Sequence, residues 1–306
     1  MTQLPQLDAP LFLTDGGAET TLIFDDGIDL PDFAAFPLLD DADGHAALTR
    51  YFERYAGIAE RDGAGIVLET ATWRANPDWA ARLGYDDEQL ATVNRKAVDL
   101  LLDVRQRFAI PVVISGCVGP RGDAYRPESI MTREEARDYH SPQIRTFAGT
   151  PADLVTAMTL TNVPEATGIV DAAREANVPV VISFTVETDG RLPSGDALGD
   201  AIEAVDRDTN GYPAYYMVNC AHPTHIAPAL DPGAEWTKRL RGIRANASKQ
   251  SHAELDEAEV LDRGDPEELA DDYRKLRALF PGLTVLGGCC GTDHRHIDAI
   301  SRKLSG

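Results

Sequence analysis

The sequence predicts a single-domain (β/α)8 barrel over residues 1–306. Eight short apolar runs of strand length alternate with longer segments in which apolar residues recur at helical spacing. No linker, low-complexity tract or abrupt change of composition divides the chain. Polar and sulfur-bearing residues follow several of the runs, and barrel active sites lie at the carboxyl ends of strands. Together these observations favour a closed parallel barrel with its site at one end.

The eight predicted strands are short and rich in apolar residues. They are Leu11–Thr14, Gly65–Glu69, Pro111–Ser115, Asp153–Met158, Val178–Phe184, Ala214–Asn219, Arg241–Asn246 and Leu283–Leu286. The rival fold is a doubly wound open sheet, which usually carries a glycine-rich nucleotide loop after its first strand. Here the first run is followed by Asp15-Gly-Gly-Ala-Glu-Thr20, which is too short and too acidic for such a loop. The barrel is therefore preferred.

Apolar stripes and capping signals predict the main helices. The clearest stripes lie in Gly44–Arg61, in Asp87–Phe108 and in Asp265–Phe280, and a last helix is expected from about His294. The run Thr132-Arg-Glu-Glu135 has the pattern of a capping box at the start of a further helix. Pro142 is expected to interrupt that helix, because proline lacks the N–H of the helical ladder.

The charge of the chain excludes some classes of partner. Its formal net charge is −21, whereas nucleic acids and anionic membranes require a basic surface. Arginine outnumbers lysine by 24 to 5 among the basic residues. The acidic excess fits either ordinary variation or adaptation to a salty cytoplasm, in which self-repulsion is screened.

Neither a membrane span nor a secretory leader is visible in the sequence. No run of 18 apolar residues occurs, and the first residues, Met1-Thr-Gln-Leu-Pro5, do not combine a basic region with an apolar stretch. Four cysteines in 306 residues do not make a disulfide scaffold. Reactive thiols fit a reducing compartment, so the predicted location is the cytoplasm.

Three cysteines point to a metal site. Cys289 and Cys290 follow the last apolar run between glycines, which permit a sharp bend, and Cys220 ends another run. Three thiolates at two strand ends suggest a Zn²⁺ site with its fourth position open to a substrate. Isolated cysteines are often only small buried residues, and that reading is kept for Cys117.

Histidines near these cysteines are weaker candidates for the metal. His222 and His225 follow Cys220 at a spacing that can bind metals, but Pro223 breaks the local geometry and three cysteines already suffice. His294 and His296 open the last predicted helix and are expected at the surface.

Motifs along nearly the whole chain carry a family resemblance. The runs Gly287-Gly-Cys-Cys-Gly-Thr292 and Val218-Asn-Cys-Ala-His-Pro223 resemble the homocysteine S-methyltransferase family, which includes betaine– and S-methylmethionine–homocysteine methyltransferases. Supporting motifs are similar to those at the first, third, fifth and seventh strands of the family. They are Leu13-Thr-Asp-Gly-Gly-Ala-Glu19, Gly116-Cys-Val-Gly-Pro120, Ile182-Ser-Phe-Thr185 with Leu192-Pro-Ser-Gly195, and Asn246.

The resemblance implies roles for several residues after the first strand. The family's matching aspartate pairs with the ammonium of homocysteine, and backbone N–H groups of the glycine turn receive its carboxylate. These roles transfer to Asp15 and to Gly16, Gly17 and Ala18. An unpaired carboxylate in a barrel mouth also favours a cation on physical grounds. A turn or helix-capping role is the alternative for Asp15.

Two further positions bear on the substrate. Many family members carry a glutamate at the end of the fourth strand, where this chain has Met158, so the ammonium would lose one partner. Trp73 aligns with an aromatic residue near the family's site, and tryptophan faces bind methylated cations; a core or rim position is the alternative. Both residues are predicted to line the substrate site.

The predicted function is zinc-dependent transfer of a methyl group from an onium donor to the thiol of homocysteine, which gives methionine. Binding of the thiol to zinc would remove its proton and keep a thiolate nucleophile available. The donor would be S-methylmethionine, S-adenosylmethionine or a betaine.

Two alternatives to this function remain. One is a barrel methyltransferase that acts on a different thiol or demethylates an unusual onium compound, and the other is a non-catalytic protein with a structural zinc–thiolate site. The expected partners are therefore small molecules, and the oligomeric state is left open.

Overall fold

The computed structural model describes residues 4–125, 129–257 and 260–305. Eight parallel strands close into a barrel in sequence order, and the first strand pairs with the last. The strands are β1 (Phe12–Leu13), β2 (Gly65–Glu69), β3 (Val112–Val118), β4 (Leu154–Leu160), β5 (Val180–Phe184), β6 (Tyr215–Asn219), β7 (Leu240–Ala245) and β8 (Val285–Gly288). The predicted (β/α)8 barrel is confirmed, and each predicted strand overlaps an observed one.

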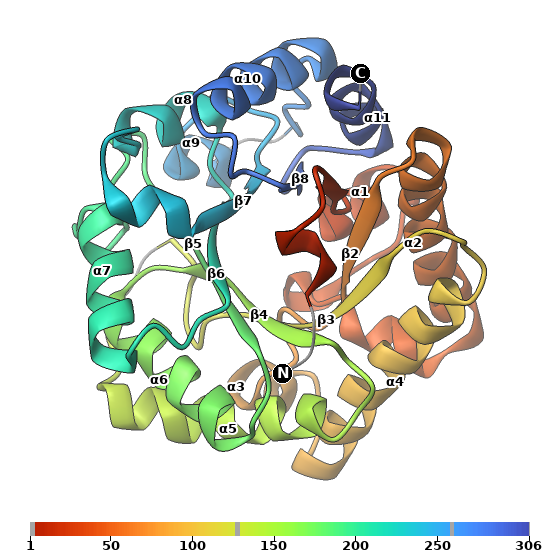
Figure 1. The fold of residues 1–306 in the computed structure, drawn as a ribbon. Coiled ribbons are helices and arrows are strands. Elements are labelled where there is room, and N and C mark those ends of the chain that lie inside the picture. Colours follow the sequence, from red (N-terminus) through yellow and green to blue (C-terminus); the bar gives the residue numbers. More distant parts are fainter. Residues whose placement is uncertain (1–3, 126–128, 258–259, 306) are drawn as a thin grey trace.

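Helices form a ring around the strands (Figure 1). They are α1 (Ala18–Phe24), α2 (Ala42–Asp62), α3 (Pro77–Arg82), α4 (Asp87–Arg105), α5 (Arg133–Ala148), α6 (Val163–Glu175), α7 (Leu198–Thr209), α8 (Pro223–Ile226), α9 (His252–Asp256), α10 (Pro266–Leu279) and α11 (His294–Leu304). The capping box predicted at Thr132 is present, with Glu135 bonding back to its backbone. None of the helices within the described ranges is long and apolar enough to cross a membrane.

The predicted interruption at Pro142 is wrong. Helix α5 continues through this residue, and its two large apolar side chains beyond it, Ile144 and Phe147, are fully buried. Helix α6 packs closely along α5, since a Cβ on Gly168 would lie only 2.6 Å from the Cβ of Ala136. Tertiary packing of this kind outweighs the lost helical hydrogen bond.

The barrel interior holds a small core of its own, separate from the larger core between strands and helices. It contains Phe12, Val67, Val113, Leu154, Val181, Tyr215, Met217 and Val285. Leu4 and Leu7 of the N-terminal segment pack against this core, and the segment crosses the barrel in Figure 1. Apolar packing therefore fills the amino-terminal part of the barrel and leaves its carboxyl end for polar residues.

Candidate active site

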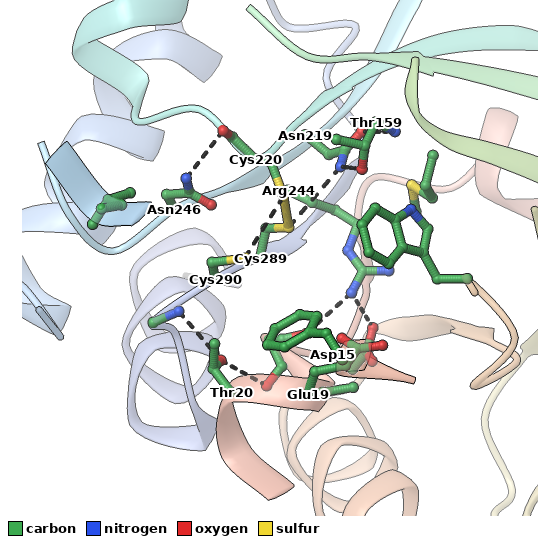
Figure 2. Close-up of a pocket in the computed structure, with 18 of the residues that line it drawn as sticks. Asp15, Glu19, Thr20, Thr159, Asn219, Cys220, Arg244, Asn246, Cys289 and Cys290 are labelled. Carbon is green, nitrogen blue, oxygen red and sulfur yellow. Dashed lines mark hydrogen bonds and ion pairs between the residues drawn. A yellow bond between two sulfur atoms is a disulfide. The ribbon is translucent and has the colours of Figure 1, made fainter. Parts of the chain in front are cut away.

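A cavity of about 380 Å³ lies at the carboxyl ends of the strands. All the residues predicted to form the site line it, namely Asp15, Gly16, Gly17, Ala18, Trp73, Met158, Cys220, Cys289 and Cys290. They come from the ends of several different strands, which bring distant parts of the chain to one edge of the barrel. Figure 2 shows the labelled members around the cavity.

The sulfur atoms of Cys220, Cys289 and Cys290 lie within 4.8 Å of one another. Cys220 follows β6, and the two vicinal cysteines follow β8. In this structure Cys220 and Cys289 form a disulfide, and the Sγ of Cys290 lies 3.9 Å from that of Cys220 (Figure 2). Burial raises the pKa of the Cys290 thiol to about 11. Once the disulfide is reduced, three sulfur donors are therefore grouped closely enough to share one soft metal ion.

The backbone around the sulfur cluster is bent and tightly packed. Cys220 adopts a φ of 55°, a left-handed conformation that is uncommon for residues other than glycine. A Cβ on Gly17 would lie 2.6 Å from the carbonyl oxygen of Cys289, and one on Gly16 would lie 2.9 Å from that of Thr292. The two glycines thus allow the loop after β1 to approach the loop after β8.

The premise that Asp15 is unpaired is wrong. The Nη2 of Arg244, on β7, lies 2.5 Å from its Oδ1, and the hydroxyl of Tyr51, on α2, donates to its Oδ2 at 3.0 Å. Burial raises the pKa of Asp15, and the charge of Arg244 and the hydrogen bond from Tyr51 oppose that rise. The backbone N–H of Gly17 donates to the carbonyl oxygen of Thr292 at 3.0 Å, so it is not free for a carboxylate.

Asn219 shapes the wall of the cavity near Met158. Its side chain accepts a hydrogen bond from the backbone N–H of Thr159 at 2.8 Å and donates to the hydroxyl of that residue at 2.7 Å. Thr159 has a φ of 61°, and the pairing of β4 with β5 shifts register between Ala157 and Leu160. This local irregularity lies within the last residues of β4, where Met158 lines the cavity with an apolar side chain.

Trp73 lines the cavity beside an arginine. The guanidinium of Arg74 lies 4.3 Å from the centre of the Trp73 ring and 3.7 Å from that of the Trp79 ring. Arg74 therefore already forms a cation–π contact on one face of Trp73, of the kind that a methylated donor would form.

The histidines near the cysteines are engaged elsewhere. The Nδ1 of His222 lies 3.2 Å from the backbone N–H of Thr224, and the Nε2 of His225 lies 3.1 Å from the carbonyl oxygen of Lys249. Burial lowers the pKa of His222 to about 4. Cys117 is buried, as predicted.

The predicted surface position of His296 is wrong. Its side chain is fully buried, and its two ring nitrogens contact the backbone N–H of Asp293 and the carbonyl oxygen of Arg263. His296 occupies the third position of α11, where it completes a capping box with Asp293.

Sequence reasoning missed several residues of the site, above all Arg244, Tyr51 and Glu69. Arg244 is a charged residue within an otherwise suitable strand run, which is a usable signal for an inward-facing functional side chain. Tyr51 lies within the apolar stripe predicted for Gly44–Arg61, and its hydroxyl contact with Asp15 depends on the closed barrel. Glu69 was the last residue of a predicted strand, and period-two alternation places it on the inner face with Val67.

The cavity and its sulfur cluster define a barrel protein suited to thiol and metal chemistry, and comparison with known proteins agrees. A homocysteine S-methyltransferase family model matches residues 12–304. The chain therefore belongs to the homocysteine S-methyltransferase family.

Relatives within this family are distant in sequence. Homocysteine S-methyltransferase 1 of Arabidopsis thaliana is 24% identical over 267 residues, which cover 79% of each chain. Selenocysteine Se-methyltransferase of Brassica oleracea var. italica is 22% identical over 262 residues, which cover 78% of this chain and 75% of that protein. Each of these alignments covers most of both proteins.

Solved structures show the same fold. The oxidized form of the homocysteine methyltransferase MmuM from Escherichia coli superposes with a TM-score of 0.77 at 23% identity, over 96% of each chain. The metallated form of the same enzyme gives a TM-score of 0.74 at 22% identity, over 98% of each chain. At this identity the likeness establishes the fold.

Proposed function

We propose that this protein is a zinc-dependent thiol S-methyltransferase, which transfers a methyl group from an onium donor to the thiol of homocysteine. The observation that carries the proposal is the grouping of three cysteine sulfurs within 4.8 Å on the wall of a cavity. Membership of the family supports the reaction class, and the metallated form of MmuM supports the presence of a metal. Three thiolate donors suit zinc in particular.

Cys220, Cys289 and Cys290 are the residues that would hold the zinc, after reduction of the disulfide. When bound, zinc lowers the pKa of an incoming thiol and keeps its sulfur nucleophilic. The cavity leaves space for the acceptor beside the cysteines. In a structural zinc site, a fourth protein ligand would close that position.

The other chain residues bind and orient the two reactants. We assign the acceptor subsite to Asp15–Ala18 and Met158, and the donor side to the aromatic surface of Trp73. Methyl transfer in line from an onium carbon requires no proton donor or enzyme nucleophile. Holding the two reactants together in a partly dry cavity would supply most of the rate enhancement.

A second candidate acts on a different thiol, one that lacks the α-ammonium group. The ion pair between Asp15 and Arg244, together with the apolar side chain of Met158, favours this alternative, because both weaken the expected attraction for an ammonium.

A matrix of methyl donors and thiols tests both functions with reduced, zinc-loaded protein. Donors are S-methylmethionine, S-adenosylmethionine and a betaine, and thiols are homocysteine and analogues without the amino group. Formation of methionine is expected with at least one donor. Turnover of the analogues alone would favour the second candidate, and no methyl transfer in any combination would contradict both.

A further inference from the structure

Glu69 is a buried carboxyl group that the family resemblance does not account for. It is the last residue of β2, is 5% exposed and lines the cavity that also contains the three cysteines. Within the described residues, 4–125, 129–257 and 260–305, its Oε2 atom has no hydrogen-bond partner. A buried polar atom without a partner is costly, so such an atom on a cavity wall points to a ligand that supplies the partner.

Two other residues predicted for this site, Asp15 and Met158, offer no open carboxyl oxygen. Both oxygens of Asp15 accept hydrogen bonds, one from Arg244 and one from Tyr51. Met158 also lines the cavity, and its thioether offers no charge. Among the residues that the structure describes, the Oε2 of Glu69 is the fully buried carboxyl oxygen on this wall that lacks a hydrogen-bond partner, and Glu19 on α1 is a further, half-buried carboxyl that lines the cavity.

We propose that Glu69 receives the ammonium group of the acceptor amino acid. This inference rests on the proposed function, because it concerns an acceptor whose thiol lies at the three cysteines. Glu69 would supply from β2 the negative charge that Met158 does not supply from β4. One ligand in the cavity would then contact the sulfur cluster through its thiol and Glu69 through its ammonium.

The charge balance around Glu69 agrees with this role. Arg244 on β7 is a cation that already pairs with Asp15, and Asp15, Cys117 on β3 and Tyr215 on β6 are titratable groups that interact with Glu69. Asp15 interacts in turn with Glu19 on α1 and with Tyr51 and Tyr55 on α2. Burial raises the pKa of Glu69 to about 7, although Arg244 and the hydroxyls of Ser115 and Thr156 lower it.

An arriving ammonium would supply a second cation beside Arg244, so that Asp15 and Glu69 would each have a positively charged partner. The carboxyl would ionise and form a charge-assisted hydrogen bond in a site of low dielectric. Binding would therefore release a proton from the fraction of Glu69 that is protonated beforehand.

Isothermal titration calorimetry with two thiols tests this contact in reduced, zinc-loaded protein. Homocysteine and 4-mercaptobutanoate differ only in the ammonium group. We expect Glu69→Gln to weaken homocysteine binding by about tenfold or more, the usual scale of a lost charge-assisted contact, and to leave 4-mercaptobutanoate binding within about twofold. Retained binding of 4-mercaptobutanoate also shows that the variant is folded and holds zinc.

Glu165→Gln is the matched control. Glu165 is equally buried, at 5% exposure, but its carboxylate is bonded to His140, Asn162 and the backbone N–H of Arg121. Removing its charge tests the general effect of losing a buried carboxylate. Homocysteine affinity is expected to stay at the wild-type value in this variant.

A second measurement uses wild-type protein alone and does not depend on any variant. At pH 7, heats measured in buffers of different ionisation enthalpy give the number of protons released. Homocysteine is expected to release more protons than 4-mercaptobutanoate, because both lose the thiol proton and only homocysteine displaces the proton of Glu69. Equal proton release by the two thiols would overturn the inference.

The remaining outcomes separate this inference from the proposed function. Unchanged homocysteine affinity in Glu69→Gln, or an equal loss for both thiols, would overturn the role of Glu69 and leave the methyltransferase proposal standing. Tighter wild-type binding of 4-mercaptobutanoate than of homocysteine would overturn the ammonium contact and favour the second candidate function. Binding of neither thiol would overturn both proposals.

Discussion

The guanidinium of Arg244 and the carboxylate of Asp15 form a buried ion pair 2.5 Å apart, although the two residues are 229 positions apart in the sequence. Arg244 also donates from its Nε to the carbonyl oxygen of Gly288 at 3.0 Å. This one side chain therefore links β7 to the loop that follows β1 and to the last residue of β8. Because the pair is buried, each partner depends on the other for compensation of its charge.

Asp15→Asn is expected to destabilise the fold as well as the acceptor site. The substitution leaves the charge of Arg244 buried without its partner, which typically costs about 3–5 kcal/mol. Freed from Asp15, the guanidinium could instead neutralise Glu69, so the KM for homocysteine should rise. Urea denaturation and steady-state kinetics measure the two effects. The double variant Asp15→Asn/Arg244→Met should recover part of the lost stability, and a fully additive loss would contradict the pairing.

The three cysteines are expected to bind about one zinc per chain in reduced protein, by the ligand count of thiolate sites. Replacement of Cys220, Cys289 or Cys290 by Ala should lower the zinc content and abolish methyl transfer. Metal analysis and the activity assay measure these outcomes, and Cys117→Ala is the control, because Cys117 is not among the grouped sulfurs. Full activity of any one of the three variants would remove that cysteine from the ligand set.

Zinc uptake is expected to depend on the redox state of the protein. The disulfide between Cys220 and Cys289 occupies two of the three sulfurs, so the oxidised chain cannot offer three thiolates. Treatment with a reductant under anaerobic conditions should restore zinc binding, with release of protons from thiols such as Cys290. Titration with a zinc indicator before and after reduction measures this, and equal zinc affinity in both states would be the contrary result.

Glu69 should make the stability of the fold depend on pH. Its pKa is raised in the folded chain to about 7 from the ordinary 4.5, so it disfavours the folded state increasingly as the pH rises from about 4.5 to 7. Glu69→Gln should therefore gain stability relative to wild type between pH 5 and pH 8, by up to about 3 kcal/mol. Urea midpoints of Glu69→Gln and wild type at the two pH values measure the gain. The same difference in midpoint between variant and wild type at pH 5 and at pH 8 would contradict the raised pKa of Glu69.

Salt should stabilise a chain with a net charge of −21. Self-repulsion of this size opposes the compact state and is screened as ionic strength rises. The urea midpoint is therefore expected to rise between low salt and about 1 M KCl, where the Debye length falls to about 3 Å. A stability that stays constant from low to multimolar KCl would exclude the hypothesis of adaptation to a salty cytoplasm.

The alternation of apolar runs and helical stripes was sufficient to predict the barrel. Barrel topology was then sufficient to predict that the site residues lie close together. Parallel strands place all their carboxyl ends at one edge, so Asp15, Cys220 and Cys289 had to meet there once the fold was known. Local patterns carry this information, because strand and helix periods depend only on neighbouring residues.

Contacts across the closed barrel were decided only by the tertiary structure. Neither the partners of Asp15 nor the unpartnered oxygen of Glu69 can be read from neighbouring residues, since each depends on side chains from other strands and helices. The same holds for α5, whose packing keeps it helical through Pro142 against the local preference of proline. Local sequence determines which elements form, whereas charge compensation and burial depend on what the folded chain brings next to each side chain.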